Sequence, residues 1–289
     1  MPRLLRRFTL TDTVETDSPR DPRLDPIGVF DSGIGGLTVA AALKNLLPSE
    51  TIFYIGDTAR VPYGGKSRKT VERYSIEIGG LLLAEQAKMI VVACNTASAL
   101  AVPRMKEIFN VPVQGVVTPG AEAAVRATRN GRIGVIGTRA TISSGAYERS
   151  IHALDPNVQV FSDPCPLLVP FIEEGLFEDP LTDQVIARYL APLLDRNIDT
   201  LVLGCTHYPL VRAAIGRGAG SDVVLVDSAE NCALAVKTLL ESQNRAAPSD
   251  RLGKLDVALT DATEGFLRTA ERALGLEIGD VDLRIVQAE

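Results

Sequence analysis

The sequence has no tryptophan, only two histidines and only four cysteines among its 289 residues. No two cysteines are spaced as CxxC, so we expect no zinc or iron–sulfur site. Apolar runs are short, as from Met89 to Ala93, and none approaches the roughly 18 residues that suggest a membrane span. Basic residues are in the minority, 30 against 36 acidic ones, giving a net charge of −6. We therefore expect neither a membrane nor a nucleic acid as a partner.

The first 25 residues also lack the pattern of a targeting signal. Their basic cluster, Arg3, Arg6 and Arg7, is followed by acidic residues and prolines instead of a continuous apolar segment. We expect residues 1–25 to form a disordered extension and the protein to reside in the cytoplasm. In that compartment the four cysteines are expected to be free thiols, because disulfides rarely persist there.

Short β-branched runs alternate with amphipathic stretches along most of the chain, which indicates alternating strands and helices and a parallel sheet. The helical patterns include residues 71–86, 119–128 and 182–194. We expect strands at residues 27–30, 51–55, 89–93, 113–117, 133–136, 158–161, 200–203 and 223–226.

An internal repeat organises these strands. The run Ile27-Gly28-Val29 recurs 106 residues later as Ile133-Gly134-Val135, and the strand at 51–55 has a counterpart 107 residues later. The strand that leads to Cys94 corresponds to the strand that leads to Cys205, 111 residues further on. The sequence therefore predicts two similar α/β units, each with helices on both faces of a parallel sheet and one cysteine at the carboxyl end of a strand.

Ligands of open parallel sheets bind just outside the carboxyl ends of the strands. Two such units facing one another would place the two thiols on opposite sides of one cleft, which we take as the active site. Taken singly, either cysteine could equally be a buried core residue, because cysteines are common in protein cores. The residues that follow them favour a functional role.

Polar residues follow both cysteines: Asn95 and Thr96 after Cys94, and Thr206 and His207 after Cys205. Such residues after a buried strand indicate the beginning of a helix. Its free N–H groups suit the binding of a carboxylate, and its dipole should lower the pKa of the thiol. His207 is near enough in sequence to exchange a proton with Cys205 or with its substrate.

The first predicted strand ends in the glycine-rich run FDSGIGGLTV from Phe30 to Val39, with Asp31 and Ser32 at its carboxyl end. A dinucleotide-binding turn is the rival interpretation, with Asp57 as its acidic residue. However, the third glycine of that fingerprint would fall at Thr38, and Asp57 is more simply a turn residue. The following loop, residues 61–67, has groups that could hold a ligand, although its composition alone suits a surface turn.

Together these motifs closely resemble glutamate racemase, a member of the aspartate/glutamate racemase family. The resemblance runs from about Ile27 to the late helices and leaves residues 1–25 outside. Two segments are highly specific, ACNTASA around Cys94 and LGCTHYPL around Cys205. Aspartate racemases also have two catalytic cysteines, but we do not associate them with these sequence motifs around the cysteines.

The resemblance implies a racemisation of glutamate without pyridoxal, metal or any other cofactor. One cysteine thiolate removes the α-proton and the other cysteine, as a thiol, reprotonates the opposite face. Cys94 and Cys205 would be the acid/base pair, with Asp31 assisting Cys94 and His207 assisting Cys205. Substrate contacts would come from Asp31, Ser32, Tyr63, Gly64, Asn95, Thr96, Thr206 and His207. A glutamate is also implicated near Phe171, and the choice between Glu173 and Glu174 stays open.

The resemblance further implies that residues 228–289 fold back onto the first unit. The predicted domains are therefore 26–117 with 228–289, and 118–227. The product D-glutamate would supply peptidoglycan synthesis and thereby cell-wall biogenesis and cell shape. Oligomeric state is left open, a homodimer included. Two rival functions also stay open, a nucleotide-dependent enzyme built on residues 31–36 and an additional role as an inhibitor of DNA gyrase.

Overall fold

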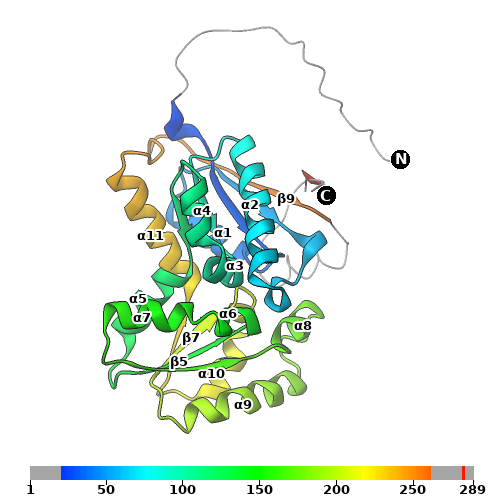
Figure 1. The fold of residues 1–289 in the computed structure, drawn as a ribbon, viewed down its shortest axis with the longest axis vertical. Helices are drawn as coiled ribbons and strands as arrows, with labels where there is room; N and C mark the ends of the chain where they lie inside the picture. The colour runs from blue at the N-terminus through cyan, green and yellow to red at the C-terminus, as the bar shows by residue number, and fades with distance from the viewer. Residues whose placement is uncertain (1–20, 262–281, 284–289) are drawn as a thin grey trace.

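The computed structural model describes residues 21–261 and 282–283. Two parallel sheets form the core of the protein (Figure 1). The first has the order β10-β9-β2-β1-β3-β4 and the second the order β6-β5-β7-β8. The strands of the first sheet are β1 (Ile27–Asp31), β2 (Ile52–Gly56), β3 (Met89–Val92), β4 (Val113–Gly115), β9 (Leu255–Leu259) and β10 (Asp282–Leu283). Those of the second are β5 (Arg132–Gly137), β6 (Gln159–Pro164), β7 (Thr200–Gly204) and β8 (Val224–Asp227).

The two sheets repeat one strand order. If β1 is matched with β5, the orders β2-β1-β3-β4 and β6-β5-β7-β8 are the same. The register agrees as well, since Ile27 pairs with both Ile52 and Met89 while Ile133 pairs with both Val160 and Thr200. The eight strands expected from the sequence are all present, so the predicted internal repeat is a repeat of structure.

Helices cover both faces of each sheet (Figure 1). On the first sheet, Val29 packs with α1 and α11, whereas its neighbour Phe30 packs with α2 and α4 on the opposite face. This alternation follows from the period of two along a strand. These helices are α1 (Leu37–Leu46), α2 (Arg68–Ala84), α3 (Asn95–Leu100), α4 (Val102–Ile108) and α11 (Ser228–Ser242).

The second sheet has the same layering. Val202 packs with α5 and α7, and Leu203 packs with α9 and α10 on the other face. The helices around this sheet are α5 (Val117–Ala127), α6 (Arg139–Ser143), α7 (Ala146–Leu154), α8 (Leu168–Glu173), α9 (Pro180–Leu194) and α10 (Arg212–Ala219). The predicted fold class, two similar parallel-sheet α/β units with helices on both faces, is confirmed.

The C-terminal part returns to the first sheet, because β9 pairs with β2 from Ile52–Leu255 to Gly56–Leu259. The division into domains 26–117 with 228–289, and 118–227, stays our interpretation. Its residues 262–281 and 284–289 lie outside the described residues.

We predicted a disordered extension over residues 1–25, of which residues 1–20 lie outside the described residues. Its last residues need a correction. Residues Pro22–Leu24 form a 3-10 helix capped by Asp21, and Lys88 Nζ donates a hydrogen bond to the Arg23 carbonyl at 2.7 Å. Residues 21–25 are therefore folded onto the first sheet.

Candidate active site

The two candidate catalytic cysteines occupy equivalent places in the two sheets. Cys94 follows β3 and caps α3, where its sulfur accepts a hydrogen bond from the Ala97 N–H at 3.5 Å. Cys205 follows β7, the strand that corresponds to β3 in the second sheet. Both side chains are buried, with 4% and 6% of their surface exposed.

One small cavity, with about 20 Å³ of free space, is lined by both cysteines. This space is about that of one water molecule, so the walls of the cavity lie close together. Of the residues that we predicted to bind substrate, Asp31 alone does not line this cavity. The others all do: Ser32, Tyr63, Gly64, Asn95, Thr96, Thr206 and His207. Segments from both sheets thus converge on one enclosed space.

The protonation of Cys94 differs from our expectation that a helix N-terminus would lower its pKa. Burial raises the pKa of the Cys94 thiol, and the nearby negative charge of Asp31 raises it further. The hydrogen bonds with Ala97 and Ser32, the latter a 3.6 Å contact between Sγ and Oγ, favour the thiolate but do not offset burial. Cys94 is therefore a neutral thiol at neutral pH, because desolvation penalises the charged form more than these hydrogen bonds stabilise it.

Cys205 has a different partner. Its sulfur lies 3.9 Å from Nδ1 of His207, and Nε2 of that ring lies 3.3 Å from Oε1 of Glu173. Burial alone would lower the pKa of His207, but the Cys205 sulfur and the Glu173 carboxylate raise it more, and the result is about 10. His207 is thus an imidazolium at neutral pH, and it places a positive charge beside the Cys205 sulfur.

The same contact distinguishes the two glutamates that the sequence left open. Glu173 ends α8 and reaches His207, whereas Glu174 is the exposed residue after the helix. Glu173 is therefore the glutamate of this segment that belongs to the site.

Asp31 does not line the cavity, but it contacts Thr206, a residue that does. Its Oδ2 accepts hydrogen bonds from the Gly36 N–H at 2.8 Å and from the Thr206 hydroxyl at 3.4 Å. Its Oδ1 is buried without a hydrogen-bond partner among the described residues. The glycine-rich turn is what allows this packing. A Cβ at Gly36 would lie 2.4 Å from the Asp31 Cβ, and one at Gly35 would lie 2.6 Å from His207 Nδ1.

Two polar side chains of α3 form hydrogen bonds with residues around the second sheet. Asn95 Oδ1 accepts a hydrogen bond of 2.6 Å from the Tyr147 hydroxyl, while its Nδ2 is buried without a partner among the described residues. The Thr96 hydroxyl lies 2.9 Å from that of Thr138 and 3.1 Å from that of Thr141. The unpaired amide of Asn95 is thus an available donor at the cavity wall.

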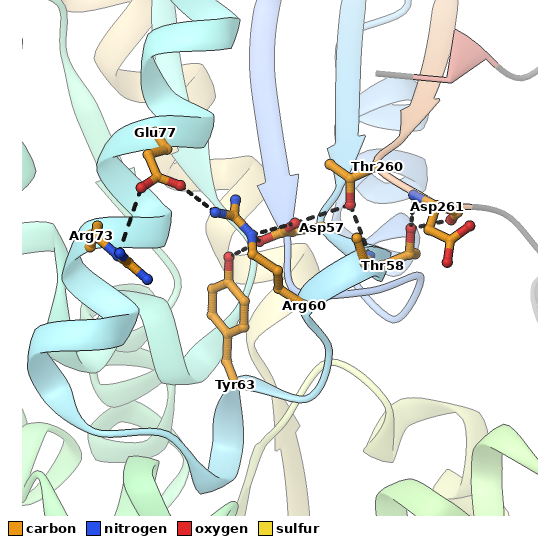
Figure 2. Close-up of polar contacts among 9 residues, drawn as sticks. Asp57, Thr58, Arg60, Tyr63, Arg73, Glu77, Thr260 and Asp261 are labelled. Atoms are coloured by element: carbon orange, nitrogen blue, oxygen red, sulfur yellow. Dashed lines mark hydrogen bonds and ion pairs between the residues drawn. The ribbon is translucent and has the colours of Figure 1, made fainter. Parts of the chain in front are cut away.

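Tyr63 contributes its ring to the cavity, but its hydroxyl is already in use. It donates a hydrogen bond to the buried carboxylate of Asp57 (Figure 2). The same carboxylate accepts hydrogen bonds from Arg60 Nε at 2.7 Å and from the Thr260 hydroxyl at 3.0 Å. Arg60 in turn pairs with Glu77 of α2 (Figure 2).

This network corrects our interpretation of Asp57 as a simple turn residue. Asp57 is completely buried and joins the loop of Tyr63 to the end of β9. The dinucleotide interpretation also loses support, because the carboxylate it needs for a ribose is enclosed by three protein donors.

The sequence interpretation missed Thr138 and Val169 in the cavity wall, and Tyr147 behind Asn95. One signal was available for Thr138. The offset of 106 residues between β1 and β5 maps Ser32 onto Thr138, so the repeat places both hydroxyls at the ends of equivalent strands. Nothing comparable marks Val169 or Tyr147.

The described part of the chain has neither a candidate metal site nor a candidate membrane span. No group of three or more His, Cys, Asp or Glu side chains there is placed to hold a metal ion. Among the same residues, no helix combines the length and the apolar character that a membrane crossing needs.

Comparison with known proteins agrees with this geometry. The family model described as Asp/Glu/Hydantoin racemase matches residues 37–236. A glutamate racemase of Geobacter metallireducens is 46% identical over 91% of this chain and 97% of the relative.

Solved structures give the same result. A glutamate racemase isoform from Bacillus anthracis has a TM-score of 0.87 and 41% identity, covering 91% of this chain and 98% of that one. Glutamate racemase from Francisella tularensis, crystallised with D-glutamate, has a TM-score of 0.84 and 38% identity, covering 92% and 98%.

Proposed function

The chain belongs to the Asp/Glu/Hydantoin racemase family, and on that premise we propose that it interconverts L- and D-glutamate by a two-cysteine acid/base mechanism without a cofactor. The observation that carries the proposal is the common cavity of Cys94 and Cys205. Each cysteine comes from the equivalent strand of a repeated unit. A racemase must treat two mirror-image substrates nearly alike, and a duplicated unit with one base in each half suits that task.

In this mechanism the substrate α-carbon lies between the two sulfurs. One thiolate removes the α-proton, and the other cysteine delivers a proton to the opposite face. The neutral Cys94 thiol supports its role as the proton donor in the resting enzyme. The imidazolium of His207 beside Cys205 is the kind of positive neighbour found at reactive cysteines. General acid–base catalysis of this kind is typically worth about 10²–10⁴-fold.

The supporting roles follow from the contacts. Asp31, held by Gly36 and Thr206, would assist Cys94, and His207, paired with Glu173, would assist Cys205. The substrate carboxylates and ammonium group would be bound by side chains and backbone groups of the lining residues Ser32, Tyr63, Gly64, Asn95, Thr96, Thr206 and His207. Asp31, which does not line the cavity, keeps only the role of assisting Cys94. None of the described residues that line the cavity is Arg or Lys. Hydroxyls, backbone N–H groups and the free Asn95 amide are therefore the proposed carboxylate ligands.

We propose glutamate as the substrate because the relatives named above are glutamate racemases, one of them crystallised with D-glutamate. The supply of D-glutamate for peptidoglycan in the cytoplasm is proposed with it, on the same resemblance.

The test is direct. The purified protein is incubated with L-glutamate, and circular dichroism is followed until the signal decays to that of the racemate. Activity should persist after prolonged treatment with a chelator, and the protein should have no visible Schiff-base absorbance. Faster turnover of aspartate would reassign the substrate, and loss of activity on chelation that a metal restores would contradict the mechanism.

A further inference from the structure

A second hollow adjoins the catalytic cavity. Gly64 lines both, and Arg139 of the second hollow directly follows Thr138 of the cavity wall. Its walls come from the turn that leads into α2 and from α6, which face one another where the two halves of the molecule meet (Figure 1). We call this hollow the vestibule; it is lined by Gly64, Gly65, Lys66, Ser67, Arg68, Leu100, Arg139, Ala140, Ser143 and Ser144.

The vestibule is positively charged. Lys66, Arg68 and Arg139 line it, and none of its described lining residues is acidic. Arg68 is partly neutralised by Glu72 at 3.7 Å. Lys66 and Arg139 form no ion pair with the described residues; Lys66 only lies over the ring of Tyr74, 5.9 Å from its centroid. The vestibule therefore has two cations without an ion pair and a third that is partly neutralised, in a chain whose net charge is −6.

The described lining of the catalytic cavity contains neither Lys nor Arg, and its one cation, His207, is paired with Glu173 and faces Cys205. Unpaired cations outside the cavity would add a longer-range attraction for an anion that approaches it. A glutamate with two carboxylates and one ammonium group has a net charge of −1. A cleft lined by charges of one sign raises the local concentration of the opposite ion and can increase association rates by about 10- to 1,000-fold.

From these observations we propose that the vestibule is the entrance to the active site and attracts an anionic amino acid through Lys66 and Arg139. This inference rests on the proposed function and deepens it, since the entrance adds a preference for acidic over neutral amino acids. The two cations act from the entrance through their charge and do not touch the reacting atoms.

The test compares the wild type with the double variant Lys66→Gln/Arg139→Gln at increasing salt. At about 10 mM salt, where the Debye length is about 30 Å, kcat/KM for L-glutamate should fall three- to tenfold on substitution while kcat stays within about twofold. At about 1 M salt, where the Debye length is about 3 Å, the two proteins should have equal kcat/KM. The variant should therefore show a shallower dependence of kcat/KM on salt.

Controls separate charge from other causes. The variant Lys106→Gln/Arg126→Gln removes the same net charge from exposed positions on α4 and α5 and should keep the wild-type salt dependence. Arg139→Lys keeps the charge and should keep most of kcat/KM. The single variant Arg139→Gln repeats the measurement without disturbing the contact of Lys66 with Tyr74.

The inference is overturned if the vestibule variants and the control variant have the same salt dependence, or if the loss in kcat/KM is unchanged at high salt. Both outcomes require a wild type that racemises glutamate. If the wild type has no racemase activity, the proposed function itself fails and the entrance role fails with it.

Discussion

The Glu173 carboxylate lies 3.3 Å from Nε2 of His207, the ring nitrogen opposite the one that faces Cys205. His207 therefore links a carboxylate of α8 to the sulfur at the end of β7. Burial lowers the pKa of His207, but the Cys205 sulfur and the ion pair with Glu173 raise it more, so the ring keeps its proton.

The first prediction concerns the proton of His207. Glu173→Gln should lower its pKa from about 10 toward its ordinary value, since one of the two groups that raise it loses its charge. The chain has only two histidines, so a pH titration of the ring signals by NMR resolves both, and a His152→Gln variant assigns them. Glu174→Gln, the exposed neighbour, is the matched control and should leave the titration unchanged. An unshifted His207 in the Glu173 variant would show that the ion pair does not hold the proton.

The second prediction concerns stability and pH. The pKa of His207 is raised in the folded state, from an ordinary value of 6.5 to about 10. Its protonation therefore contributes stability that is fully present below about pH 6.5 and is lost as the pH rises through about 10. Urea unfolding of the wild type and His207→Asn should show a stability difference that shrinks over this range. His152→Asn serves as the control. A difference that grows with pH would mean that the ring is neutral in the folded protein.

Much of the fold could be predicted from the sequence because its signals are local and repeated. The short β-branched runs that alternate with amphipathic stretches, and the recurrence of Ile27-Gly28-Val29 at residue 133, predict the strands, the helices and the two-unit plan. Cys94, Cys205 and the polar residues after them could be located because the carboxyl ends of parallel strands are where ligands bind.

The remainder depends on contacts between distant segments, which a local pattern does not contain. Asp57 looks like any turn residue until Tyr63, Arg60 and Thr260 surround it. The choice between Glu173 and Glu174 needed the position of His207. The pKa of Cys94 could not be inferred from its capping position, because burial, a property of the tertiary structure, is the largest influence on it.

The third prediction concerns the Asp57 network. Asp57→Ala should destabilise the protein by about 3 kcal/mol, because it leaves the buried Tyr63 hydroxyl without its acceptor and removes one of the two carboxylates that pair with Arg60. Tyr63→Phe removes one hydrogen bond and should cost about 1 kcal/mol. Glu107→Gln, which breaks an exposed pair with Arg104, should cost less than about 1 kcal/mol. Denaturant unfolding measures all three, and an Asp57→Ala cost as small as that of Glu107→Gln would contradict the network's structural role.

The fourth prediction concerns the Asn95 amide. Its Oδ1 accepts from the Tyr147 hydroxyl, which leaves Nδ2 as a donor for the substrate. Tyr147→Phe removes this restraint and should raise KM for glutamate severalfold with a smaller change in kcat, since losing a neutral hydrogen bond is worth about 1 kcal/mol. Asn95→Asp should raise KM further, because a carboxylate repels the substrate carboxylates. Steady-state rates in both directions test this, and an unchanged KM in both variants would remove Asn95 from the substrate site.

The fifth prediction tests the division of labour between the two thiols. If Cys94 and Cys205 each serve one face of the α-carbon, D-glutamate formed from L-glutamate in deuterated water contains solvent deuterium at the α-carbon from its first appearance. The remaining L-glutamate should stay protiated early in the reaction, because the removed proton lies on a different group from the one that delivers deuterium. Cys94→Ala and Cys205→Ala should each abolish racemisation, since neither can complete the inversion.

The most direct single measurement is therefore the early deuterium content of the L-glutamate pool, followed by mass spectrometry or NMR while D-glutamate accumulates. The two-cysteine account predicts deuterium in the product and almost none in the remaining substrate. Deuterium entering the substrate pool as fast as the product forms would indicate one shared base and would contradict it.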